Sequence, residues 1–209
     1  IDLLEKMAED SKEYGNEESN DDYRYSYYTI DRLMESVASD LMYEMSSADH
    51  MINWPEALQK RIEGFGKKYI ANTLKRGLAN NAFKNDDLVT AKKYFNEADM
   101  DYSYSGSYYY YGYYYGSSRI RLLNELTNVI GQTDKESLMK IANRLKDNHE
   151  KTLAIQYYEK LEKMQLSEDE LAQVYMYKAY CYRKLKRPED MFLAHDYVAE
   201  HLNKTSLAD

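Results

Sequence analysis

The sequence predicts an all-α protein built as a stack of antiparallel helical hairpins. The chain has only 2 prolines and 8 glycines among 209 residues, and Leu, Ala, Lys and Glu outnumber Val and Ile, which favours helices over sheets. Apolar residues recur at intervals of three and four, as they do along one face of a helix. A helix-turn-helix pattern also returns several times along the chain, which is typical of a repeat protein.

The clearest hairpin lies at residues 141–161, IANRLKDNHEKTLAIQYYEKL. A polar turn at 147–149 separates its two helices. Its apolar positions are Ile141, Ala142, Leu145, Leu153, Ala154, Tyr157, Tyr158 and Leu161. Small residues such as Ala142 and Ala154 stand where two helices approach closely, and large residues such as Tyr158 fill the space beside them. This order is typical of a hairpin that stacks on copies of itself.

Two further copies follow the same order. Residues 78–98, LANNAFKNDDLVTAKKYFNEA, align with the first copy without a gap, and Ala79 and Phe95 take a small and a large position. The third copy begins at residues 179–191, AYCYRKLKRPEDM, where Ala179 takes the small position. Its second helix fits the pattern less well than the first.

Residues 67–202 resemble the tetratricopeptide repeat family, whose unit is a helix-turn-helix of 34 residues. That family places small residues at its eighth, twentieth and twenty-seventh positions and an aromatic residue at its twenty-fourth. The matching residues here are Ala79, Ala91, Ala98, Phe95 and Tyr158. The resemblance implies a right-handed superhelical stack of about five hairpins, in which the first helix of each unit lines a concave groove.

A run rich in Tyr, Ser and Gly occupies residues 101–118, and the chain holds 24 Tyr against 4 Phe and 1 Trp. In the repeat register, Gly112 stands midway between two small positions, which predicts a further hairpin over 107–116 and 118–130. The alternative is a disordered loop, because Ser and Gly favour neither helix nor strand. The composition also resembles the Tyr/Ser/Gly loops of engineered binders.

The predicted organisation has three parts: an acidic tail or linker at 1–22, an N-terminal helical hairpin at 23–66, and repeats at 67–209. Residues 1–22 hold nine acidic residues and two lysines, a balance of −7 within a net charge of −8, and only 1–10 is predicted as a weak helix. The predicted helix pairs are 23–46/55–63, 67–84/87–99, 107–116/118–130, 135–147/150–163 and 168–186/188–202.

Transferring the groove positions of the family to this register gives the candidate binding residues. They are Arg76, Asn80, Phe83, Tyr109, Tyr113, Met139, Asn143, Lys146, Met176, Tyr180 and Arg183. Such a groove suits an extended or helical peptide, because Asn can bond its backbone and Arg or Lys can reach its carboxylates. Arg76 with Asn80 partly resembles the carboxylate clamp of chaperone-binding members, although Tyr110 stands where that clamp needs an Asn in the next unit.

A second candidate surface is basic. Residues 60–84 contain seven basic residues and one acid, and Arg61, Lys68 and Lys75 repeat every seven residues. Such a face suits an acidic partner, the chain's own acidic N-terminus or nucleic acid. The lack of a helix-turn-helix DNA-binding signature disfavours nucleic acid, and a solvated helix face is the simplest interpretation.

Signals for catalysis and metal binding are weak. The four His residues show no ligand spacing with one another or with Cys181, which reads as a small core residue. No phosphate-binding loop or nucleophile elbow is present. We therefore expect no enzymatic activity, no catalytic or metal site and no cofactor.

The expected location follows from cysteine usage and hydropathy. No apolar run approaches the roughly 20 residues that span a bilayer. A single cysteine favours a reducing compartment such as the cytoplasm. The chain starts at Ile1 without Met, which leaves processing of the N-terminus open, and with it secretion or an envelope location.

The function expected from these features is that of a non-enzymatic adaptor or chaperone that binds a protein or peptide in the Tyr-lined groove. One alternative is a ligand-sensing regulatory domain of a larger protein. Another is a structural or assembly subunit that forms a homo-oligomer through its Tyr-rich surface.

Overall fold

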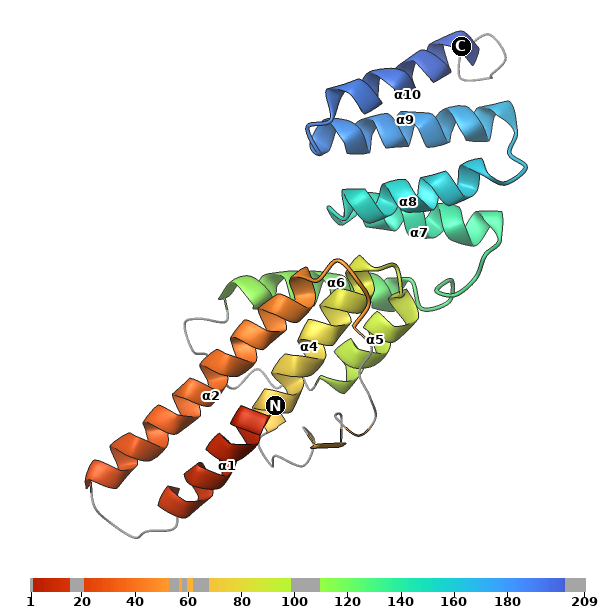
Figure 1. Ribbon diagram of the computed structural model, residues 1–209. Coiled ribbons are helices and arrows are strands. Elements are labelled where there is room, and N and C mark those ends of the chain that lie inside the picture. The colour runs from red at the N-terminus through yellow and green to blue at the C-terminus, as the bar shows by residue number, and fades with distance from the viewer. Residues whose placement is uncertain are drawn as a thin grey trace. The chain divides into compact units, whose positions relative to one another are not determined.

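Helices make up all the regular secondary structure in the part of the chain that the structure describes. The structure, a computed structural model, describes residues 2–15, 21–52, 57, 60–61, 68–98 and 110–201. Neighbouring helices pack against one another (Figure 1), so the predicted all-α class is confirmed. The chain divides into two compact units, Ile1–Gly116 and Ser117–Asp209.

Four described helices of the first unit pack in the order of the sequence. They are α1 (Asp2–Gly15), α2 (Asp21–Ser47), α4 (Lys68–Lys84) and α5 (Leu88–Glu97). Helix α1 packs against α2, α2 against α4, and α4 against α5 (Figure 1). The helix predicted at 55–63 lies outside the described residues except at 57, 60 and 61.

Helix α1 belongs to the folded body of the first unit. The core that it joins contains Leu4, Met34, Ala38, Ile70, Ala71 and Leu74. Leu4 is fully buried, and Met7, one turn further along α1, packs against the same core. For residues 2–15 this corrects the expectation of an acidic tail or linker at 1–22, in which only 1–10 is predicted as a weak helix. Leu4 and Met7 form an apolar helix face that the acidic composition of the segment conceals.

Arg61 holds the acidic side of α1 by ion pairs. Its guanidinium donates to the carboxylates of Asp2, at 2.5 Å, and Glu5, at 2.5 and 2.7 Å. These bonds keep the pKa values of both carboxyl groups below their usual range. Of the partners expected for the basic segment 60–84, the chain's own N-terminus is therefore the one that Arg61 contacts.

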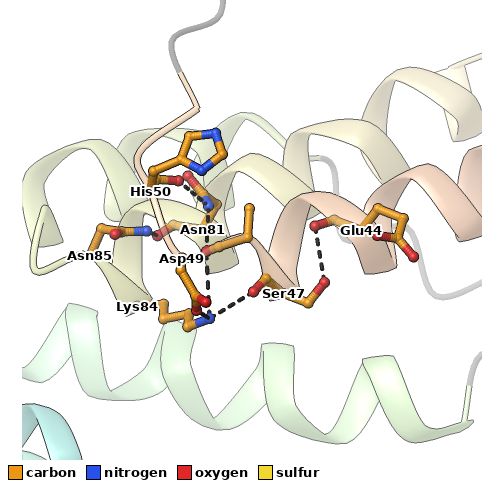
Figure 2. Close-up of polar contacts among 8 residues, drawn as sticks. Glu44, Ser47, Asp49, His50, Asn81, Lys84 and Asn85 are labelled. Atoms are coloured by element: carbon orange, nitrogen blue, oxygen red, sulfur yellow. Dashed lines mark hydrogen bonds and ion pairs between the residues drawn. The ribbon is translucent and has the colours of Figure 1, made fainter.

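A buried asparagine positions the segment that leaves α2. Asn81 of α4 is 1% exposed, and its amide donates to the carbonyl oxygens of Ala48, at 3.3 Å, and His50, at 3.0 Å. Its Oδ1 accepts from the N–H of Ile52 at 2.8 Å. Figure 2 shows Lys84 beside it, donating to the last turn of α2 at the carbonyl of Ser47, 2.7 Å away. Both side chains satisfy backbone groups that would otherwise be unpaired where the helix ends.

The second unit contains two hairpins that pack on each other through α8 and α9. The helices are α7 (Lys135–Asp147), α8 (Lys151–Glu162), α9 (Glu168–Lys184) and α10 (Pro188–His201). Their bounds match the predicted pairs 135–147/150–163 and 168–186/188–202 to within a few residues. The core of this unit contains Leu138, Ile141, Leu145, Leu153, Tyr158, Leu161, Val174 and Cys181.

The hairpin predicted at 107–116/118–130 is wrong. Helix α6 runs without a break from Tyr110 to Glu125, through the position of the expected turn, and a turn at 126–131 ends with Gly131 at φ 84°. The loop alternative is also wrong for 110–118, whereas 101–109 lies outside the described residues. Ser117 and Ser118 are poor helix formers, but each costs less than about 1 kcal/mol, and burial of Leu122 and Leu126 outweighs that cost.

Three hairpin turns share one geometry. In each, a residue of positive φ follows the first helix: Asp86 at 66°, His149 at 69° and Lys186 at 58°. The next N–H then donates back across the helix end to a carbonyl five residues earlier, at 2.9, 3.0 and 2.9 Å respectively. This is the Schellman ending of a helix. The small residues Ala79, Ala142 and Ala179 are each no more than 1% exposed, so the three aligned copies share the same turn geometry and the same buried small position.

Candidate binding face of the C-terminal unit

An open hollow of about 650 Å³ lies between α7 and α9. It is lined by Lys135, Glu136, Met139, Lys140, Asn143, Arg144, Asp147, Glu170 and Gln173. All but the last two belong to α7, where they recur at intervals of three and four and so share one helix face. The volume is within the usual range of ligand sites in proteins.

The N-terminal ends of the two helices close one end of the hollow. Asp134 caps α7 by accepting from the N–H of Ser137 at 2.9 Å, and Ser167 forms a capping box with Glu170 at the start of α9. Lys135 then pairs with Glu170 at 2.6 Å. The hydrogen bond from Lys135, followed by that from the Ser167 backbone, lowers the pKa of Glu170 to about 2.

A buried tyrosine holds one of the residues that line the hollow. Tyr158 of α8 is fully buried, and its hydroxyl donates to Oδ1 of Asn143 at 2.7 Å. Burial raises the pKa of this phenol well above its usual value. The bond leaves the amide N–H groups of Asn143 as the donors that a ligand can use.

A cluster of cations surrounds one exposed tyrosine toward the C-terminal ends of α7 and α9. This Tyr180 cluster consists of Tyr180, Lys146, Lys151, Arg183 and Lys184. The four cationic groups stand 5.4 to 5.6 Å from the centre of the Tyr180 ring, within the range of cation–π attraction. Lys146 also lies 4.9 Å from the ring centre of Tyr177, on the preceding turn of α9.

Cys181 lies beneath this cluster and is chemically quiet. Its side chain is fully buried, and burial raises its pKa to about 11. The thiol therefore stays protonated at neutral pH and is a poor nucleophile. The interpretation of Cys181 as a core residue is confirmed.

The structure brings six of the candidate residues together on the second unit. Met139 and Asn143 line the hollow, Lys146, Tyr180 and Arg183 belong to the Tyr180 cluster, and Met176 is exposed on α9. The family register missed Lys135, Lys140, Arg144, Lys151, Gln173 and Lys184. Lys135 and Lys140 lie three or four residues from Met139 or Asn143 and so share their helix face. This spacing could have predicted both lysines.

The candidate residues at 76–113 are partly buried, buried in the core, or outside the described part of the chain. Arg76 and Asn80 are partly buried on α4. Phe83 is 1% exposed and belongs to the core, so its side chain offers no surface to a ligand. Tyr109 lies outside the described residues. Tyr113 lies within α6, and its side chain is outside the described part.

The described ranges hold neither a metal-binding cluster nor a membrane-spanning helix. No group of three or more His, Cys, Asp or Glu side chains there could hold a metal ion. None of the helices described is both long enough and apolar enough to cross a membrane.

The described residues form helices, and the second unit presents a hollow of mixed charge beside the cationic Tyr180 cluster. No protein-family profile, curated protein or solved structure matches the chain. The resemblance to tetratricopeptide repeats therefore stays a prediction from the residue pattern.

Proposed function

We propose that this chain is a non-enzymatic scaffold of the tetratricopeptide-repeat type, which binds a peptide or protein segment along the face formed by α7 and α9. The observation that carries the proposal is the hollow of about 650 Å³ between these helices. It offers the amides of Asn143 and Gln173, the thioether of Met139 and cationic edges. Six of the nine lining residues are charged, three of each sign, so the hollow suits a chain segment that carries polar and charged groups of its own.

The repeat geometry supports the same proposal. Because the hairpin turns of the second unit are equivalent, the first helices α7 and α9 present corresponding positions. Those positions are where the repeat family binds extended or helical peptides. In this proposal the hairpins form a right-handed superhelical stack, and the protein works in a reducing compartment such as the cytoplasm, where its one cysteine stays unpaired.

Self-assembly is a second candidate function, and a separate observation favours it. Helix α10, in the last described hairpin, exposes Phe192 by 60% and Leu193 by 69%. Large apolar side chains at the end of a helical stack suit a further hairpin or a second copy of the chain. Dissociation of an oligomer on dilution, measured by analytical ultracentrifugation, tests this role directly.

The peptide-binding role is tested by selecting peptides from a random display library against the full chain. Gln173→Trp fills the hollow with a large side chain. Gln156→Trp on α8 is its matched control, since Gln156 is also an exposed helical glutamine but lies outside the hollow. We expect the selected peptides to bind the wild type and the control equally, and Gln173→Trp at least about tenfold more weakly. Equal binding to all three proteins, or no enrichment at all, would contradict the proposal.

A further inference from the structure

The Tyr180 cluster carries more positive charge than its own surroundings neutralise. Among the described residues, Asp147 is the carboxylate that pairs with the cluster, through Lys146 at 2.6 Å. The ammonium of Lys151 is held by the carbonyl oxygen of Lys146, and its side chain is 6% exposed. Arg183 and Lys184 contact the Tyr180 ring, and no described carboxylate pairs with them.

The helix ends explain only part of this arrangement. Cations are favourable near the C-terminal end of a helix, where carbonyl oxygens are unpaired, and this accounts for the bond from Lys151 to Lys146. It does not require four cations to converge on one aromatic ring. Like charges at this separation repel one another, so an anionic group placed among them relieves repulsion as well as forming new hydrogen bonds.

We propose that the Tyr180 cluster binds the carboxylates of an acidic segment of a partner protein, and that this segment extends into the neighbouring hollow. The inference rests on the proposed function and specifies its partner. Lys146 and Arg183 supply the donors, and the face of Tyr180 supplies an apolar surface for the aliphatic part of a Glu side chain. Lys140 extends the cationic edge along α7, whereas Lys135 and Arg144 already pair with Glu170 and Glu125.

The charges in the hollow favour a polypeptide over a nucleic acid. Glu136, Asp147 and Glu170 also line it, and they would repel an evenly charged phosphate backbone. An acidic peptide carries its charges at separate positions and can place neutral residues beside these three. The chain's own acidic N-terminus is a poorer occupant, because Asp2 and Glu5 already pair with Arg61.

The test measures binding of a fluorescent peptide of alternating Glu and Leu to the full chain by anisotropy. Lys146→Gln and Arg183→Gln each remove one donor from the cluster. Lys163→Gln is the control, because Lys163 is an exposed lysine outside the cluster and this substitution also removes one positive charge. We expect each cluster variant to bind about 5- to 10-fold more weakly, with the control unchanged, and binding to weaken as salt increases. Circular dichroism verifies that each variant is folded.

A charge reversal sharpens this test. Arg183→Glu should lose affinity for the Glu/Leu peptide and gain it for a peptide of alternating Lys and Leu. Equal binding of the acidic peptide to all variants overturns the inference. So does binding of single-stranded DNA, or of a peptide copying residues 1–22, that is tighter than binding of the Glu/Leu peptide. If the acidic peptide fails while neutral display peptides bind the hollow, the inference is wrong and the proposed function stands. If no peptide of any kind binds, both are wrong.

Discussion

The hairpins α4/α5 and α7/α8 have one backbone design and two different surfaces. Both turn through a left-handed residue, and both bury an alanine and an aromatic residue at matching places. The position of Phe83 in the first hairpin is that of Lys146 in the second, and Leu88 corresponds to Lys151. Apolar residues of the first hairpin are thus replaced by cations in the second, and the turn keeps its conformation. The turn and the buried small residue define the hairpin, whereas the side chains at these two positions can vary.

The third hairpin, α9/α10, extends the comparison. Its position equivalent to Lys146 is Arg183, and its position equivalent to Asn143 is Tyr180. The Tyr180 cluster therefore forms because stacked hairpins place matching positions close together. A repeat array can in this way gather charge from residues that are far apart in the sequence.

The largest effect is expected from the matched aromatic core residues. Phe95→Ala and Tyr158→Ala each remove a fully buried ring, which should cost about 3–5 kcal/mol in the free energy of unfolding. Amide hydrogen exchange measured by mass spectrometry should show reduced protection only in the unit that carries the substitution. Faster exchange of both units in either variant would mean that the units unfold together, and the comparison of independent hairpins would fail.

Tyr158→Phe makes the second unit resemble the first at this position. It removes one hydrogen bond and leaves Oδ1 of Asn143 without that donor, so we expect a loss of about 1 kcal/mol. Urea unfolding followed by circular dichroism measures it. A loss as large as that of the alanine variant would show that the hydroxyl, and not the ring, fixes the hollow.

A second pair of matched positions tests the polar contacts. Asn81→Ala leaves the carbonyls of Ala48 and His50 and the N–H of Ile52 without their side-chain partner, at a cost of about 2–3 kcal/mol. Arg144 occupies the equivalent place in α7 but is exposed, so Arg144→Ala should change stability by less than about 0.5 kcal/mol. The urea midpoints of the two variants check this contrast, and equal losses would refute it.

The second unit should weaken in alkali. Burial raises the folded-state pKa of Cys181 from its ordinary value near 9 to about 11, and it also raises that of Tyr158. Because the unfolded chain releases these protons first, the stability they contribute is complete below pH 9 and declines as the pH rises toward 11 and beyond. The urea midpoint measured across this range should fall, and Cys181→Ala should make the fall shallower. An unchanged slope would assign the effect to other groups.

A small effect is also expected at Arg61. Its bonds to α1 are exposed, so Arg61→Gln should raise amide exchange in α1 by less than about fivefold. Leu4→Ala, which removes the buried anchor of the same helix, should raise it far more. If the order of the two variants were reversed, charge and not burial would hold α1 in the first unit.

The repeat pattern predicted the hairpins best where small and large residues alternate in register. Residues 141–161 specify their own turn and core, and their bounds could be read from the sequence. The continuous helix α6 could not, because a run of Tyr, Ser and Gly shows no periodic face, and packing of Leu122 and Leu126 decided its path. Composition likewise concealed the buried face of α1.

The candidate site was predicted in part for the same reason. Register transfer places Lys146 and Arg183 correctly on corresponding turns, but it assumes an open groove along every first helix. Phe83 is buried because α4 packs against α2 as well as α5, and that contact depends on residues far away in the sequence. The part played by Lys151 was not visible either, since its position at the start of α8 matters only after α9 has packed beside it.

The left-handed residues of the three turns have a consequence for how this chain can change. Asp86, His149 and Lys186 adopt a conformation that costs an ordinary L-residue about 1–2 kcal/mol and costs glycine almost nothing. Glycine at the His149 and Lys186 turns would therefore release strain without touching the hollow or the Tyr180 cluster. A protein engineer could use that gain to tolerate bolder changes on the binding face, and a lineage that acquired such glycines would be free to explore new partners.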